Sequence, residues 1–224
     1  MIKNFKYLDL ITAFFAAILL ISNITSSKIT TIGPFTFDAG TILFPLSYIF
    51  GDVLTEVYGY ARSRRVIWTG FAIILFASLI IFLVQKLPPA LDWDGQAAYE
   101  KILGITPRIV FASLIAFFAG EFSNSYILAK LKIHTKGKFL WLRTIFSTLI
   151  GEGLDTLIFI FIAFYGIFEK DLIITLIISN YIFKVGVEIL FTPITYAITN
   201  FLKKVENEDF YDYKTKFNPF LVRE

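Results

Sequence analysis

The stretch FLWLRTIFSTLIGEGLDTLIFIFIAFYGIF, residues 139–168, decides what kind of fold this chain adopts. It is long enough to cross a hydrocarbon core of about 30 Å as a helix, yet Glu152 and Asp155 stand near its middle. A charged side chain at the bilayer centre costs roughly 2.5–3.5 kcal/mol on insertion scales. A chain that only had to span a membrane would avoid that cost. The stretch therefore predicts a membrane helix that lines a polar site, as in a transporter or channel rather than an anchor.

Outward from this stretch, the chain holds six apolar segments long enough to span a membrane. They are residues 8–27, 39–57, 65–84, 107–131, 139–168 and 172–202. Pro45 and Gly51 interrupt the second, and such broken spans are where transporters often bind their substrates. The apolar fraction is 56%, above the roughly 45–50% of soluble domains. We therefore predict an all-α integral membrane protein built as a six-transmembrane-helix bundle.

The segments between and after the spans predict smaller features. Residues 29–38, ITTIGPFTFD, place β-formers on both sides of a Gly33-Pro34 turn signal, which predicts a small extracytoplasmic β-hairpin between helices 1 and 2. The transporter domain is predicted to cover residues 1–202. Residues 203–224 are predicted to form a polar cytoplasmic tail that lies in water.

Positive charge indicates the orientation. With the N-terminus inside, the cytoplasmic segments hold fifteen Lys and Arg residues and the outer segments hold five, while Lys184 lies within a span. Loops rich in Lys and Arg stay on the cytoplasmic side. We therefore predict a multi-pass protein of the cell (inner) membrane with its N- and C-termini in the cytoplasm.

Composition excludes several kinds of site. The chain has no cysteine, and its one histidine, His134, lies in a lysine-rich loop, so neither thiolate nor histidine metal sites are expected. We find no nucleophile set or phosphate-binding glycine loop, so no enzyme activity and no cofactor are predicted. The net charge of +3 is too small and too localised to predict nucleic-acid binding.

Three segments repeat one pattern, a glycine followed by an acid and then by another polar residue about one helical turn later. They are GDVLTE (51–56), GEFSNS (120–125) and GEGLDT (151–156). Spacings of three and four place these polar groups on one face of each helix. Glu121 and Glu152 both fall near mid-span and could share one cavity. Lys184 and Glu188, four residues apart, could instead neutralise each other, and Ser and Thr in these spans could simply tie helices together.

Taken together, these motifs resemble the queuosine precursor transporters, also called the vitamin uptake transporter or YhhQ family. FPLSYIFGDVLTEVYGY (44–60) is similar to the family's signature, and three further groups support the resemblance over roughly residues 8–202. These groups are Gly120-Glu121-Phe122 with Asn124-Ser125; Arg143 with Ser147-Thr148, Gly151-Glu152 and Asp155-Thr156; and Lys184 with Glu188, Pro193 and Tyr196.

The resemblance implies import of deazaguanine bases such as 7-cyano-7-deazaguanine and 7-aminomethyl-7-deazaguanine, and it leaves open whether import is proton-coupled. A carboxylate can accept the ring N–H and the exocyclic amine of such a base bidentately, and aromatic rings can stack on its faces. The predicted substrate-binding residues are Tyr48, Asp52, Trp68, Glu121, Asn124, Glu152 and Asp155. The residues predicted to relay a proton or charge are Glu56, Arg143, Lys184 and Glu188. Whether Glu121 or Glu152 reads the base edge stays open.

Two modes of action fit these residues. The first is a secondary transporter that works alone. The alternative is the substrate-binding subunit of an energy-coupling-factor type importer, which would dock through a small-residue face such as Ala13 and Ala17 in the first span. The expected partners are the small base and the lipid bilayer, and the oligomeric state, including a homo-oligomer, is left open.

Overall fold

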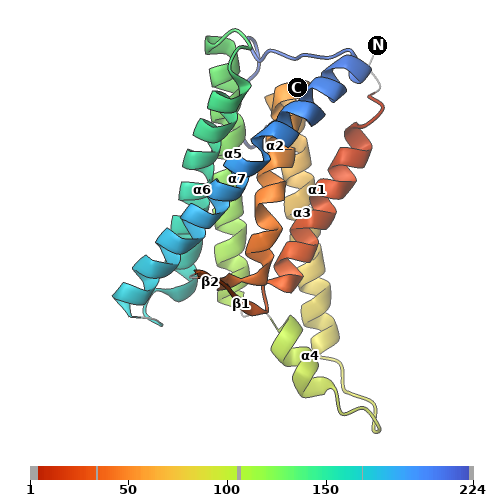
Figure 1. Cartoon of the computed structure of the whole chain (residues 1–224). Coiled ribbons are helices and arrows are strands. Elements are labelled where there is room, and N and C mark those ends of the chain that lie inside the picture. The colour runs from red at the N-terminus through yellow and green to blue at the C-terminus, as the bar shows by residue number, and fades with distance from the viewer. Residues whose placement is uncertain (1–4, 34, 105–106, 168, 222–224) are drawn as a thin grey trace.

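The computed structural model describes residues 5–33, 35–104, 107–167 and 169–221. Long helices run along one axis, and the start of α1 lies at the same end of the bundle as the segment after α7, opposite the strand pair and α4 (Figure 1). The elements are α1 (Leu8–Thr25), β1 (Ile29–Ile32), β2 (Phe35–Asp38), the 3-10 helix η1 (Ala39–Ile42), α2 (Phe44–Tyr58), α3 (Tyr60–Gln85), α4 (Gln96–Leu103), α5 (Pro107–His134), α6 (Leu140–Phe164) and α7 (Lys170–Glu206).

Five of these helices are long and apolar enough to be candidate membrane spans, namely α1, α3, α5 from Phe111 onward, α6 and α7. The second predicted span is shorter than expected, because residues 39–42 form η1 and α2 has only 15 residues. At 1.5 Å per residue α2 is about 22 Å long, less than the hydrocarbon thickness of about 30 Å. The structure is thus a helical membrane bundle in which one helix does not qualify as a span by length.

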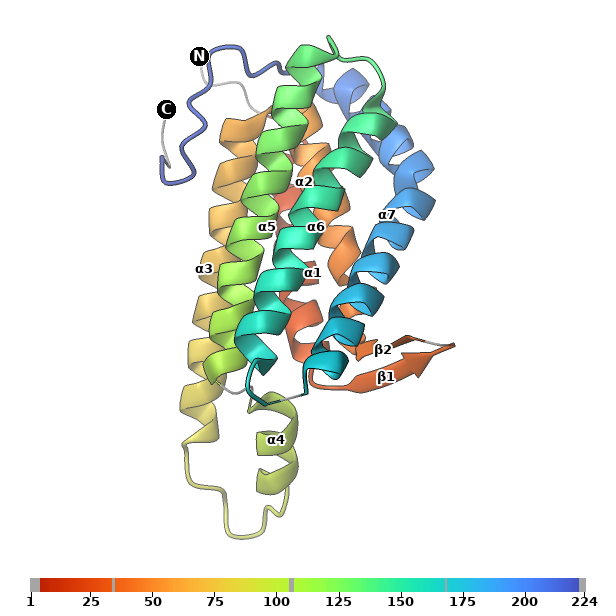
Figure 2. The same ribbon diagram turned by 90° about the vertical axis from the view of Figure 1, so that its left-hand side faces the viewer.

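The short helix α2 is the central element of the bundle. Pro45 lies in its first turn, where a missing N–H costs nothing, and Gly59, with φ of +85°, ends it. It packs against α1, α3, α5 and α7, and twelve of its fifteen residues are buried; Figure 2 shows it enclosed by the outer helices. By contrast, α3, α6 and α7 turn apolar side chains such as Phe76, Phe161 and Ile182 outward, as lipid contact requires.

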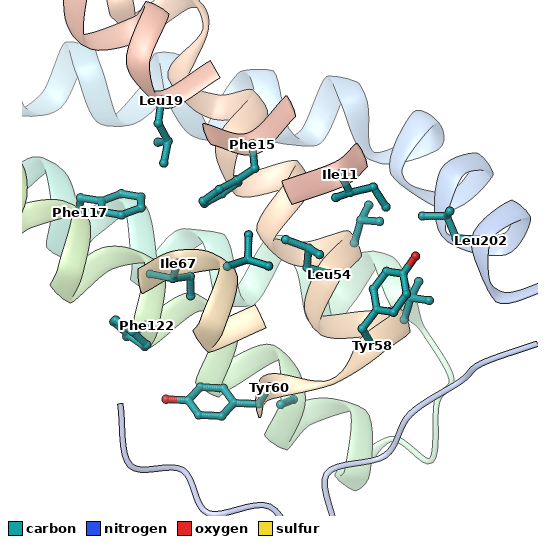
Figure 3. Packing of buried hydrophobic residues seen from close by; sticks show 14 of the residues in the cluster. Ile11, Phe15, Leu19, Leu54, Tyr58, Tyr60, Ile67, Phe117, Phe122 and Leu202 are labelled. Carbon is teal, nitrogen blue, oxygen red and sulfur yellow. The ribbon is translucent and has the colours of Figure 1, made fainter. Parts of the chain in front are cut away.

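The apolar core lies on one side of α2. Leu54 of α2 belongs to one buried cluster with Phe15 of α1, Ile67 of α3 and Phe117 of α5 (Figure 3). Close packing of these side chains fixes the rotation of α2 about its axis. Its remaining face, which carries Tyr48, Asp52 and Glu56, is thereby directed to α5, α6 and α7.

Two features lie at the end of the bundle opposite the termini. β1 and β2 pair antiparallel, with Ile29 opposite Asp38 and Ile32 opposite Phe35; Pro34 of the predicted turn lies outside the described residues. Helix α4 lies between the predicted spans 65–84 and 107–131, where no helix was predicted. It begins after Gly95 and ends before Gly104, whose ψ of 62° leaves the helical region.

The C-terminal segment lies against the bundle. Helix α7 continues to Glu206, four residues past the predicted end of the transporter domain. Residues 207–221 then fold back across the end of the bundle, where Phe210 N donates to Val57 O at 3.2 Å and Trp68 Nε1 donates to Pro219 O at 2.8 Å. Asp212 is only 2% exposed, so the segment predicted as a polar cytoplasmic tail packs in part against the bundle.

Candidate functional site

Helices α2, α5, α6 and α7 bring buried charged side chains into one region within the bundle, which we name the acid cluster. Its members are Asp52, Glu121, Glu152, Asp155, Lys184 and Glu188, each at most 7% exposed. Asp52 lies within electrostatic range of Glu121 and Glu188, and Glu121 lies within range of Glu152. The structure therefore joins in one place six residues that the sequence distributes over four helices.

Glu121 has no polar partner in the described part of the chain. Its side chain is fully buried, and both of its carboxylate oxygens lack a hydrogen bond there. It occupies space that only glycine leaves open, because a Cβ on Gly51 would lie 2.0 Å from Glu121 Oε1. The glycine in the α2 motif thus lets the α5 carboxylate approach the α2 backbone.

A hydrogen bond joins the side chains of Asp52 on α2 and Asn124 on α5. Asn124 Nδ2 donates to Asp52 Oδ1 at 2.7 Å, and both side chains are fully buried. A hydrogen bond to an ionised acceptor is worth more than a neutral one. This contact leaves Asp52 Oδ2 and Asn124 Oδ1 without partners in the described chain.

Lys184 of α7 pairs with the two acids of α6. Its Nζ lies 2.7 Å from Asp155 Oδ2 and 3.1 Å from Glu152 Oε2. It also lies 4.4 Å from the centroid of the Phe44 ring, within cation–π range. The alternative that Lys184 neutralises Glu188 on its own helix is therefore not what the structure shows, and both oxygens of Glu188 lack hydrogen-bond partners in the described chain.

Hydroxyl groups complete the surroundings of the cluster. The hydroxyls of Tyr48, Thr148 and Thr156 are buried and without hydrogen-bond partners among the described residues. Tyr48 lies against the backbone of α5, since a Cβ on Gly120 would be 2.3 Å from its hydroxyl oxygen. The region thus offers carboxylate acceptors together with hydroxyls that can either donate or accept.

A second cluster lies toward the end of the bundle that holds the termini, and we name it the Glu56 cluster. Glu56 Oε1 lies 2.7 Å from Arg143 Nη2, 2.6 Å from Lys203 Nζ and 3.6 Å from Lys132 Nζ. Lys132 and Lys203 in turn contact Asp209 Oδ1 at 2.6 Å and 2.8 Å. The four residues predicted to relay charge are thus divided, with Glu56 and Arg143 here and Lys184 and Glu188 in the acid cluster.

Asp209 links this cluster to the C-terminal segment. Burial alone would raise the pKa of its carboxyl, but hydrogen bonds from Lys132 and Lys203 outweigh burial and hold the pKa below its usual value. Sequence reasoning missed Lys132, Lys203 and Asp209. The only signal for them was the position of both lysines at helix ends, which is also where unpaired surface lysines occur.

Trp68 is placed differently from the prediction. Its ring packs among Phe71, Phe118, Phe122 and Phe220, and its N–H is used by Pro219 O. The side chain therefore serves the docking of the C-terminal segment, and none of its described contacts is with the acid cluster.

Comparison with known proteins assigns this chain to a family. The family described as "Putative vitamin uptake transporter" matches residues 38–198. The "Probable queuosine precursor transporter" of Bacillus subtilis (strain 168) is 31% identical over 177 residues, covering 79% of this chain and 77% of that protein. The chain belongs to the queuosine precursor transporter family.

Two further relatives extend this family assignment. The "Queuosine precursor transporter" of Escherichia coli (strain K12) is 27% identical over 206 residues, which is 90% of each chain. A "Probable queuosine precursor transporter" of Haemophilus influenzae is 25% identical over 190 residues, covering 80% of this chain and 78% of that protein. No solved structure matches this member of the family. The region shared with the family model contains the whole acid cluster, whereas Lys203 and Asp209 lie beyond it. The family is one of transporters, not enzymes.

Proposed function

We propose that this chain imports queuosine precursors, deazaguanine bases such as 7-cyano-7-deazaguanine and 7-aminomethyl-7-deazaguanine, and that the acid cluster binds the base. The names of the relatives support the substrate. The cluster supports the place, because buried ionisable residues inside a membrane bundle are costly and mark substrate pathways. A deazaguanine also carries several N–H donors, which match a site rich in acceptor oxygens.

The observation that carries this proposal is the carboxylate of Glu121, fully buried with both oxygens unpartnered in the described chain. The ring N–H and the exocyclic amine of a guanine-like edge lie side by side, so one carboxylate can accept both. Glu152 was the other candidate, but its Oε2 is already paired with Lys184 at 3.1 Å. We therefore assign the base edge to Glu121.

The remaining groups of the base have candidate partners nearby. Its carbonyl needs a donor, which the unpartnered hydroxyls of Tyr48, Thr148 or Thr156 can provide. One N–H of Asn124 is used by Asp52, so the amide is not the first choice for this contact. The buried ring of Tyr48 offers a face for stacking.

Glu121→Gln tests the assignment. The amide keeps the shape of the side chain but replaces one acceptor oxygen by a donor, so it repels one N–H of the base edge. Binding of a deazaguanine to the purified protein should weaken by about 5- to 150-fold, the range for loss of a bidentate base-edge contact. Glu169→Gln removes the same charge at an exposed position and should bind like the wild type. Equal binding by both variants contradicts the role of Glu121.

The membrane topology follows from the same geometry. Five spanning helices would place the two ends of the chain on opposite sides, whereas the start of α1 and the end of α7 lie at one end of the bundle (Figure 1). We propose that α2 makes the sixth crossing, shielded from lipid by its neighbours. Both termini would then be cytoplasmic in the inner membrane, as the excess of positive charge favours, and β1–β2 would face outward.

Cysteine labelling tests this topology cleanly, because the chain has no cysteine of its own. Ala90→Cys and His134→Cys introduce thiols at exposed positions on opposite ends of the bundle. An impermeant thiol reagent added to intact cells should label position 90 and leave position 134 unlabelled until the membrane is opened. The reverse pattern contradicts the orientation.

The energy source defines two modes of action. We propose a secondary transporter that works alone, with the unpaired acids of the cluster as candidates to carry a proton. The energy-coupling-factor alternative is supported by Ala13 and Ala17, which lie exposed on α1 and offer a small-residue face for docking. Uptake by this chain in proteoliposomes without any partner subunit supports the first mode and excludes a requirement for the second.

A further inference from the structure

Positive and negative charges in the acid cluster are unequal. Five carboxylates, those of Asp52, Glu121, Glu152, Asp155 and Glu188, are buried with one ammonium, that of Lys184. Lys184 forms ion pairs with Glu152 and Asp155. Asp52, Glu121 and Glu188 make no ion pair within the described residues. Because a buried carboxylate without a positive partner is strongly unfavourable, the cluster is electrostatically suited to accept a cation.

A second observation shows that the cluster is incomplete without a ligand. The hydroxyl of Tyr48, a side chain with no exposed surface, has no hydrogen-bond partner in the described chain and lies in the field of Asp52, Glu121 and Glu152. A buried hydroxyl surrounded by acceptors would normally donate to one of them. Its unused donor and acceptor capacity points to a polar molecule between it and the acids.

We propose that the acid cluster selects bases that carry a positive charge, and that Glu188 receives this charge. The proposal rests on the proposed function, which places the guanine-like edge at Glu121. Glu188 is the remaining carboxylate with neither a hydrogen bond nor an ion pair in the described chain, whereas Glu152 is paired with Lys184 and Asp52 is held by Asn124. Glu188 lies on α7 and Glu121 lies on α5. The guanine-like edge and the charged substituent of one base can therefore contact acids from different helices.

The chemistry of the two candidate bases makes the selection specific. An aminomethyl substituent is an ammonium group at neutral pH and offers three N–H donors to surrounding carboxylates. A cyano substituent is neutral and directs a nitrogen lone pair outward, toward the same oxygens. The charged base therefore gains charge-assisted hydrogen bonds in this site, while the cyano base meets acceptor against acceptor.

Three ligands that differ only in one substituent test the proposal on the unaltered protein. We would measure, by calorimetry in lipid nanodiscs, the affinities of 7-aminomethyl-, 7-hydroxymethyl- and 7-cyano-7-deazaguanine. The hydroxymethyl group has nearly the shape of the aminomethyl group without its charge. The aminomethyl base should bind at least about tenfold more tightly than either neutral base, the effect expected for a hydrogen bond to a charged group.

Glu188→Gln then locates the selection. This variant should lose the preference, weakening the aminomethyl base by about tenfold or more while changing the hydroxymethyl base by less than about threefold. Glu169→Gln, an exposed acid near the start of α7, should keep the wild-type preference, and thermal unfolding would confirm that both variants are folded.

The possible results separate the two levels of the argument. Equal affinities for the aminomethyl and hydroxymethyl bases in the wild type overturn the charge selection and leave the proposed transport function standing. A preference that persists in Glu188→Gln overturns the assignment to Glu188. Failure of all three bases to bind folded wild-type protein overturns the proposed substrate, and the selection falls with it.

Discussion

Glu121 owes its position to the absence of a side chain on Gly51, and this dependence can be tested without touching the carboxylate. In Gly51→Ala the new Cβ would lie 2.0 Å from Glu121 Oε1, so the flexible end of the glutamate must move. Alanine is favoured over glycine inside a helix by roughly 0.5–1 kcal/mol, which protects the fold. We expect Gly51→Ala to remain folded but to bind a deazaguanine at least about fivefold more weakly, because a bidentate contact is lost.

Gly186→Ala on α7 is the matched control for this substitution. A Cβ there meets nothing within 4 Å, so binding and stability should equal or exceed those of the wild type. Thermal unfolding followed alongside calorimetry separates loss of the site from loss of the fold. Wild-type affinity in Gly51→Ala would show that base binding does not depend on the position of Glu121 beside Gly51.

At the scale of single residues, the sequence located the buried acids but not their partners. Glu152 and Asp155 were correctly placed on one helical face, because a spacing of three is read directly from the chain. The pairing of Lys184 with these two acids, at 3.1 Å and 2.7 Å, depends on how α7 is rotated against α6. Spacing within one helix carries no information about that rotation. For the same reason Glu56 and Arg143, 2.7 Å apart, could not be separated in advance from Lys184 and Glu188.

At the scale of helices, α5 and α6 approach closely through one glycine on each. A Cβ on Gly151 would lie 2.9 Å from the backbone oxygen of Gly120 and 2.8 Å from Asn124 Cβ. Small residues allow such an approach between membrane helices. The glycines that precede the acids in the repeated motifs therefore set the distance between the helices that hold the acid cluster.

Gly151→Ala should consequently destabilise the bundle. The clash involves backbone that cannot rotate away, and overpacking of this kind costs typically about 1–3 kcal/mol, which lowers the Tm by at least about 2 °C in a chain of this size. Gly153→Ala on the same helix is the comparison, since its Cβ would meet only Tyr181 at 3.5 Å. A Tm for Gly151→Ala at or above that of Gly153→Ala would contradict the close-contact role.

The sequence predicted α2 as an unusual helix for a sound reason but did not predict its length. Pro45 starts it rather than breaking it, and Gly51 lies inside it without interruption. Hydropathy averages over a window and cannot distinguish a helix that faces lipid from one buried among other helices. Burial of α2 among four neighbours is a tertiary property, which is why the sequence predicted a broken second span over residues 39–57 where the structure has a 3-10 helix followed by a short central helix.

At the scale of the whole molecule, the C-terminal segment holds together the end of the bundle where the chain starts and ends. Asp209 accepts hydrogen bonds from Lys132 of α5 and Lys203 of α7, so it joins two helices and the tail. Nothing local in the polar sequence after residue 206 signals this docking, because its partners in α2, α3 and α5 are more than seventy residues away. The sequence likewise does not signal that Trp68, predicted to bind substrate, donates its N–H to Pro219 O of this segment.

Asp209→Asn tests this docking. The variant loses two charge-assisted hydrogen bonds, but the side chain is 44% exposed, so the loss should not exceed about 1 kcal/mol, or about 2–4 °C in Tm. The folded-state pKa of Asp209 is depressed, so its contribution is present above the unfolded pKa and is lost as the pH falls through the folded value. The difference in Tm from the wild type should therefore shrink on acidification. Asp92→Asn, in an exposed loop, is the control for loss of one carboxylate.

Selection of a charged base has a consequence for transport by the whole molecule. A membrane potential of 100 mV, negative inside, is worth about 2.3 kcal/mol per elementary charge, enough to accumulate a monovalent cation about 40-fold. In proteoliposomes with a potassium diffusion potential, uptake of 7-aminomethyl-7-deazaguanine should rise more steeply than uptake of the neutral 7-hydroxymethyl base as the interior becomes negative, because any proton carried with the substrate adds the same charge to both. Liposomes with Glu121→Gln protein provide the background. If the neutral base responds equally to the potential, the moving charge is a proton carried with the substrate, and charge on the base is not what drives its import.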